Sequence, residues 1–161
     1  MSRLRRALPS PGEALIGAVG WALVMAVSAF LRLFCQRWQT PEKYVEVALL
    51  FGLGGALAFP AGLLAARLAA CGRSRQAAFA AAFLGLALAT FGFTAIAFAL
   101  DYRQYYATWH AEAFSLRWAF EFFFTSVGAF VQFAVLGSRL FFPLGFVALF
   151  VAALWFARSP R

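Results

Sequence analysis

Apolar residues run almost unbroken along most of this chain, and charged residues interrupt them at intervals. Three long stretches contain no charged residue: they lie between Glu13 and Arg32, between Glu46 and Arg67, and between Arg75 and Asp101. Each is about 20 residues long, the length that an α-helix needs to cross ~30 Å of hydrocarbon at ~1.5 Å per residue. A soluble helical domain would instead alternate polar and apolar faces. The pattern therefore predicts an all-α integral membrane protein.

Two further apolar runs follow, so the pattern predicts a bundle of five transmembrane helices in a single domain, residues 1–161. The predicted helices cover residues 13–33, 45–66, 77–100, 115–136 and 140–157. Only Gly137-Ser138-Arg139 separates the last two, with Pro143 close behind. A continuous helix from Trp118 to Ala157 would be ~60 Å long, twice the hydrocarbon thickness, so the chain must turn there. The alternative is four spans plus a re-entrant or interfacial segment.

Small residues recur every four positions on one face of each of the first three predicted helices. The rows are Ala14, Ala18, Ala22 and Ala26; Gly54, Ala58, Gly62 and Ala66; and Ala77, Ala81, Gly85 and Ala89. Such rows let helix backbones approach closely, and close packing drives association where lipid supplies no hydrophobic force. We therefore expect these helices to form a compact core, with Gly54, Gly62 and Gly85 facing other helices. The last two helices are rich in phenylalanine, which suits lipid or a partner better.

The net charge of +8 changes this picture little. The arginines are spread over the loops and both tails, so we expect contacts with anionic lipid headgroups and none with nucleic acid. Acid-free clusters precede the first helix and follow the second, at Arg3, Arg5 and Arg6 and at Arg67, Arg73 and Arg75. The positive-inside rule then predicts a cytoplasmic N-terminus, with residues 67–76 inside and residues 101–114 outside. Arg158 and Arg161 oppose this orientation, because five spans would put the C-terminus outside.

Two features of composition and length concern the kind of membrane. Abundant alanine and arginine with a single lysine favour a GC-rich bacterial genome, so we expect a multi-pass protein of the bacterial inner (cytoplasmic) membrane. The first apolar run, residues 14–31, is longer than the apolar region of a usual signal peptide. We interpret it as a retained anchor helix.

The most polar stretch of the chain is DYRQYYATWHAEAFSLRWAFE, residues 101–121. It contains the only histidine, the only aspartate and three of the six acidic residues. Written as a helix, it places four aromatic residues on one face, namely Tyr102, Tyr105, Tyr106 and Trp109. Aromatic rings gather at headgroup depth in membrane proteins. We therefore predict an amphipathic interfacial connection over residues 101–114.

A second polar pattern continues into the fourth predicted helix. Arg117, Glu121, Thr125, Gly128 and Gln132 follow one another at helical spacing on one stripe, and His110 joins it if the helix begins early enough. Polar groups inside a membrane usually face protein or water and often serve function. We predict an ion pair between Arg117 and Glu121, which are four residues apart. The stripe is either a functional pathway or a structural seam that holds this helix to the others.

The sequence offers little for catalysis or for a cofactor. One histidine supplies a single metal ligand without partners, so we expect no metal and no cofactor. Asp101 is the only aspartate, which excludes a pair of intramembrane aspartates. An acid–base pair of His110 and Glu112 with Arg103 and Arg117 could still act on a lipid headgroup.

Three functional hypotheses remain open. The first is a non-catalytic accessory or assembly subunit, which binds a larger membrane protein, or further copies of itself, through the phenylalanine-rich helices. The second is a small transporter or channel component that uses the stripe of His110, Arg117, Glu121, Thr125 and Gln132. The third is a lipid-modifying enzyme that acts at residues 101–117.

Overall fold

The computed structural model describes residues 7–158, and within this range the chain is all-helical, with no strand. All five predicted helices are present. The elements are α2 (Pro11–Cys35), η1 (Pro41–Lys43), α3 (Tyr44–Ala70), α4 (Arg75–Tyr106), η2 (Ala107–Trp109), α5 (Leu116–Val135), η3 (Gly137–Phe141) and α6 (Leu144–Arg158). Arg3, Arg5, Arg6 and Arg161, on which part of the predicted orientation rests, lie outside the described residues.

Three of the helices begin at a serine whose side chain accepts a hydrogen bond from the first turn. Ser10 accepts from Glu13 N at 3.2 Å, Ser74 from Ala77 N at 3.3 Å, and Ser115 from Trp118 N at 3.1 Å. The first N–H groups of a helix have no partner within the helix, so each serine satisfies one of them. These caps explain why α2, α4 and α5 begin within two residues of the predicted starts.

The predicted core of the first three helices is confirmed. The α3 row of Gly54, Ala58, Gly62 and Ala66 is buried throughout. A Cβ added at Gly62 would lie 2.9 Å from Leu86 Cα, and one added at Gly54 would lie 2.7 Å from Thr94 Cα. The predicted rows in α2 and α4 are only half-buried. In α4 this is because the neighbouring face, with Ala78, Ala82 and Leu86, is the one turned into the core.

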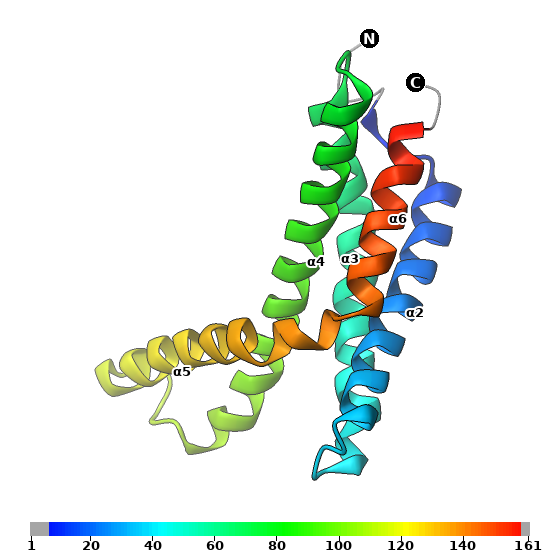
Figure 1. Ribbon diagram of the computed structural model, residues 1–161. Helices are drawn as coiled ribbons and strands as arrows, with labels where there is room; N and C mark the ends of the chain where they lie inside the picture. The colour runs from blue at the N-terminus through cyan, green and yellow to red at the C-terminus, as the bar shows by residue number, and fades with distance from the viewer. Residues whose placement is uncertain (1–6, 159–161) are drawn as a thin grey trace.

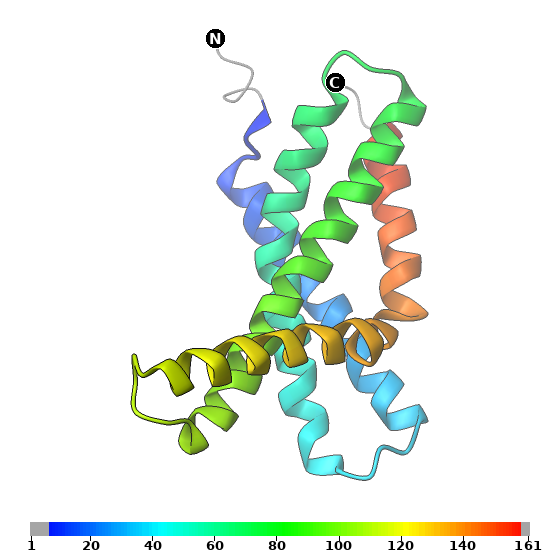
Figure 2. The same cartoon turned by 90° about the vertical axis from the view of Figure 1, so that its left-hand side faces the viewer.

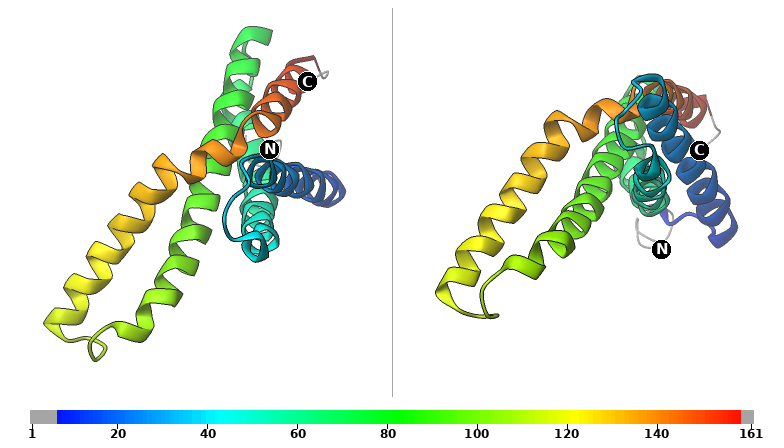
Figure 3. Two further views of the ribbon diagram at one scale, coloured as in Figure 1. Left: turned by 60° about the horizontal axis from the view of Figure 1, so that its bottom comes forward. Right: turned by 90° about the horizontal axis from the view of Figure 1, so that it is seen from below.

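The helix α5 departs from the predicted bundle. Figures 1 and 2 show α2, α3 and the first half of α4 running along a common axis, while α5 lies across that axis. In Figure 3, α5 lies beside the second half of α4 and the two form an arm that projects from the bundle. Of its residues, α5 buries only Ala129 and Phe133. It has no row of small residues that would allow close packing along its whole length.

The helix α6 then returns along the bundle to the end where α2 begins (Figure 1). Five antiparallel crossings would have put the end of α6 on the side opposite the start of α2. The expectation that the last helix ends on that opposite side is therefore wrong. Among residues 7–158, four helical segments are long and apolar enough to cross a membrane: α2, residues 41–70, residues 75–109 and residues 116–141. With 15 residues, α6 is only ~22 Å long, shorter than the ~30 Å of a hydrocarbon core.

The irregular segment between α5 and α6 is attached to the bundle by Ser28 of α2. The Ser28 hydroxyl donates to the carbonyl oxygen of Leu140 at 3.0 Å and accepts from Gly145 N at 3.3 Å. Ser28 is 2% exposed, the bond to Gly145 is buried and the bond to Leu140 is partly buried, so the hydroxyl satisfies backbone groups that are shielded by protein. Next to it, the buried ring of Phe133 packs on Phe51 and Phe141. These contacts determine where α5 ends and α6 begins.

Candidate functional site

The polar stripe of α5 meets the connection that precedes it. The predicted ion pair is present, with Arg117 Nε 2.8 Å from Glu121 Oε1. The second carboxylate oxygen of Glu121 accepts from Ala111 N at 2.8 Å. His110 Nε2 lies 3.2 Å from Thr125 Oγ1. Four of the five predicted site residues therefore gather at one end of α5.

The route by which His110 reaches the stripe differs from the prediction. His110 was expected on the stripe only if the helix began early enough, but α5 begins at Leu116, the backbone at His110 is extended, with ψ of 152°, and residues 110–115 are irregular. The chain reverses here, with Phe114 at φ +67°, and folds His110 back onto α5. The predicted connection over 101–114 is also shorter, because α4 continues to Tyr106. The stripe at this end is a seam between α5 and its own preceding loop.

The fifth site residue, Gln132, lies apart from the others. It is exposed near the far end of α5 and lines a cavity with residues of α2, α3 and α4. Between the two ends, Gly128 is exposed, and a Cβ added there would meet nothing within 4 Å. The structure therefore divides the stripe in two.

The predicted aromatic face is confirmed as a cluster of rings around the end of α4. Tyr102 and Tyr106 have ring centroids 4.6 Å apart, and the centroids of Tyr105 and Trp109 are 5.1 Å apart. On the α5 side, the guanidinium carbon of Arg103 lies 3.8 Å from the centre of the Phe122 ring. A cation over an aromatic face is attracted by the ring quadrupole, so this contact joins the two helices of the arm.

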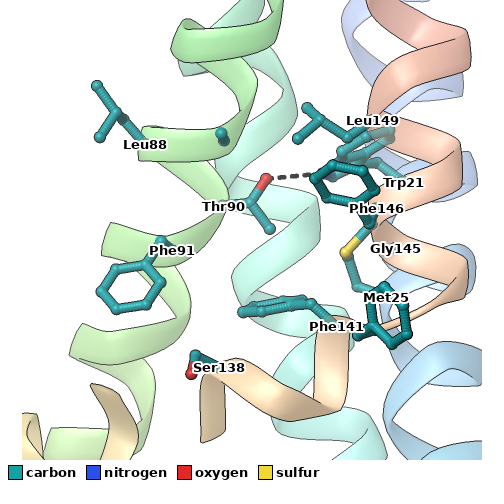
Figure 4. Close-up of a pocket in the computed structure, with 12 residues that line it drawn as sticks. Trp21, Met25, Leu88, Thr90, Phe91, Ser138, Phe141, Gly145, Phe146 and Leu149 are labelled. Carbon is teal, nitrogen blue, oxygen red and sulfur yellow. Dashed lines mark hydrogen bonds between the residues drawn. The ribbon is translucent and has the colours of Figure 1, made fainter. Parts of the chain in front are cut away.

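Sequence reasoning missed an apolar groove between α4 and α6, closed at one end by η3 (Figure 4). Its volume is about 450 Å³. The lining residues are Trp21, Met25, Ala87, Leu88, Thr90, Phe91, Ser138, Phe141, Phe142, Gly145, Phe146 and Leu149. They come from four elements that are distant in sequence, and no local pattern marks them. Only the break around residues 137–143 pointed to this region.

The polar groups of the groove already have partners. Figure 4 shows the indole of Trp21 directed at Thr90, and Trp21 Nε1 donates to Thr90 Oγ1 at 2.9 Å. The Ser138 hydroxyl donates to the Ala134 carbonyl oxygen at 2.6 Å. The lining contains no charged side chain, so the groove suits an apolar ligand segment and supplies no acid, base or nucleophile.

A second cavity, of about 230 Å³, lies on the other side of η3, and we call it the rim cavity. Its polar lining consists of Gln36, Lys43, Glu46, Asp101, Gln132 and Arg139, with Trp38 and Tyr44 beside them. Its apolar lining consists of Leu33, Val47, Leu50, Phe51, Phe98, Leu136, Gly137 and Leu140. The sequence did not indicate that these polar residues converge, because they belong to three helices and two connections.

Three of the four groups proposed for catalysis contact other side chains of the chain. Arg103 stacks on Phe122, Arg117 is paired with Glu121, and His110 contacts Thr125. Within residues 7–158, no three His, Cys, Asp or Glu side chains are grouped so that they could hold a metal. No family model matches the chain, and no curated protein or solved structure matches it. The functional argument therefore rests on the geometry.

Proposed function

We propose that this chain is a multi-pass membrane protein that acts as a non-catalytic accessory subunit and binds a larger membrane protein through α5. The observation that carries the proposal is the exposure of α5. This helix leaves the bundle, buries only Ala129 and Phe133 fully, and leaves most of its other large apolar side chains exposed. An apolar surface of this size on a protein with almost no soluble mass suits a binding role.

The exposed side of α5 has the form of a helix-docking surface. Its large apolar residues, which we call the α5 face, are Phe120, Phe123, Phe124, Val127, Phe130 and Val131. Gly128 forms a notch at the edge of this face, where the polar stripe begins, since a Cβ there would meet no neighbour within 4 Å. Small residues in such notches let a second helix approach closely in a membrane, which a fluid lipid chain does not require. The notch therefore favours a protein partner over lipid.

The arm is also held in a defined position before any partner arrives. Arg103 over Phe122 and the ion pair of Arg117 with Glu121 hold α5 against α4 and the preceding loop. A surface that is already ordered loses less conformational entropy on binding. The same contacts weaken the other two hypotheses, because His110, Arg117 and Glu121, which transport or catalysis would need, already have partners within the chain.

We further propose that the membrane is the bacterial inner membrane and that the start of α2 faces the cytoplasm. In the sequence, Arg158 argued against this orientation, because five spans would have put it outside. The fold removes that objection. Because α6 ends beside the start of α2, Arg158 lies at the same end as Arg67, Arg73 and Arg75. Only Glu13, paired with Arg67, is acidic at that end among the described residues. Arginines at one end of a bundle favour the cytoplasmic side.

Site-specific photo-crosslinking in the native membrane tests the accessory role. A photoreactive residue at Phe124, which is 65% exposed on the α5 face, should give one defined adduct with a larger membrane protein. The matched control is Leu49 of α3, which is 67% exposed on the bundle and should give no protein adduct. An adduct with a second copy of the chain at Phe124, or equal adducts from both positions, would contradict the proposal.

A further inference from the structure

Of the four charged residues that line the rim cavity, one of each sign forms no ion pair with a described residue, although the pKa of the Lys43 amine is raised by Glu46 and, to a smaller extent, by Asp101. Lys43 Nζ and Glu46 Oε2 are 2.5 Å apart, so these two side chains neutralise each other. Asp101 and Arg139 line the same cavity, yet neither forms an ion pair within 4 Å with any residue of the described range. They are also too far apart to pair with each other. The space between them is open to a ligand that carries both charges.

The surroundings of these charges are those of a membrane interface. Trp38 and Tyr44 line the cavity, and such amphipathic rings concentrate at headgroup depth. The floor, formed in part by Phe51, Phe98 and Leu140, is apolar. Asp101 ends the uncharged stretch of α4, so it lies where the apolar part of that helix stops. A ligand here would keep its charges at the rim and its apolar part on the rings.

The geometry points to a zwitterionic phospholipid, bound by its headgroup in the rim cavity. Arg139 would hold the phosphate, because a guanidinium presents several donors to phosphate oxygens. Asp101 would accept hydrogen bonds from a primary ammonium group, and the first carbons of an acyl chain would lie on the apolar floor. The volume of about 230 Å³ is below the ~300–1,000 Å³ typical of small-molecule pockets, so it suits a headgroup and not a whole lipid.

This site is separate from the α5 face, and it depends on the proposed membrane location but not on a partner protein. Gln132 belongs to it, which gives the second part of the α5 stripe a role distinct from the first. Its amide can donate to a phosphate oxygen and accept from an ammonium group. A lipid bound here would contact α2, α3, α4 and η3 together. It would therefore stabilise the position in which the arm leaves the bundle.

Native mass spectrometry of the full-length protein in detergent tests the site. Phosphatidylethanolamine should be retained about threefold to fivefold better than anionic phosphatidylglycerol, the range expected for one exposed charge pair. Asp101→Asn should abolish this preference, and Arg139→Gln should weaken retention of both lipids. Both residues are exposed, so we expect the variants to keep the thermal stability of the wild type.

The matched controls are Glu42→Gln and Arg37→Gln, which remove exposed charges nearby that do not line the cavity. Neither should change the preference. Equal retention of the two lipids by the wild type, or an unchanged preference in Asp101→Asn, would overturn the assignment. Competition by water-soluble phosphoethanolamine at the same concentration as the lipid would also overturn it, since the site would then recognise a free metabolite. None of these outcomes bears on crosslinking at Phe124.

Discussion

At the scale of single residues, Ser28 shows how one hydroxyl determines the course of a long segment. The short 3-10 helix between α5 and α6 satisfies only part of its backbone by itself, and a buried backbone group without a partner is costly. Ser28 supplies both an acceptor for Gly145 N and a donor for the Leu140 carbonyl. In the sequence it is a single serine within an apolar helix. Its partners are more than 110 residues away.

We predict that Ser28→Ala destabilises the protein by about 1–3 kcal/mol, since two buried backbone groups would lose their partner. Thermal unfolding in detergent measures this. Ser126→Ala is the control, because Ser126 donates to the Phe122 carbonyl one turn earlier in its own helix, and that carbonyl keeps its helical bond. The control should unfold within about 0.5 kcal/mol of the wild type. Equal losses in both variants would show that Ser28 is not a specific attachment point.

Glu121 makes one contact that the sequence predicts and one that it does not. Its pairing with Arg117 follows from their spacing on a helix, and the structure confirms it. The Arg117 side chain is 81% exposed, so the surrounding protein does not enclose it. The second contact, with Ala111 N, depends on a chain reversal that spacing cannot express. Glu121 therefore holds the loop as well as its helical neighbour.

At the scale of secondary structure, the contact of α3 with α4 is the closest in the bundle. Gly62 and Gly85 face each other, and a Cβ added at Gly85 would lie 2.9 Å from the Gly62 carbonyl oxygen. Backbones at this distance gain dispersion contacts along their length, which replace the hydrophobic force that lipid does not provide. The periodic row predicted this interface because a four-residue repeat of glycine and alanine leaves one face of the helix without bulky side chains.

We predict that Gly62→Ala destabilises the bundle by about 1–3 kcal/mol, because the new methyl group would press on the backbone of α4. Gly92→Ala, also within a long helix, is the control: a Cβ there would meet nothing within 4 Å. This control should be neutral or gain up to about 1 kcal/mol, since alanine favours helix more than glycine does. Chemical unfolding in detergent distinguishes the two. A Gly62→Ala protein as stable as Gly92→Ala would contradict the close contact.

At the scale of the whole molecule, the two cysteines report its orientation. Cys35 ends α2 and Cys71 follows α3, so they lie at opposite ends of the bundle, and both are free and exposed. We predict that a membrane-impermeant maleimide labels Cys35 in intact spheroplasts and labels Cys71 only after the membrane is opened. The single-cysteine variants Cys71→Ser and Cys35→Ser separate the two signals. The reverse pattern would overturn the proposed orientation, and labelling of both in intact spheroplasts would contradict the membrane-spanning bundle.

The hydropathy pattern alone determines the number of helices, their approximate bounds and the close contact of the first three. Each of these depends either on an apolar run of about 20 residues or on a periodic row of small residues. Both kinds of pattern can be recognised in the sequence itself. Only the tertiary structure decides that α5 leaves the bundle, that α6 returns to the end where α2 begins, and that Asp101, Gln132 and Arg139 line one cavity. The reason is physical: these outcomes depend on the direction in which the chain leaves the turn at residues 137–143. Ser28 and Phe133 hold that turn through contacts with distant segments, and no local pattern encodes them.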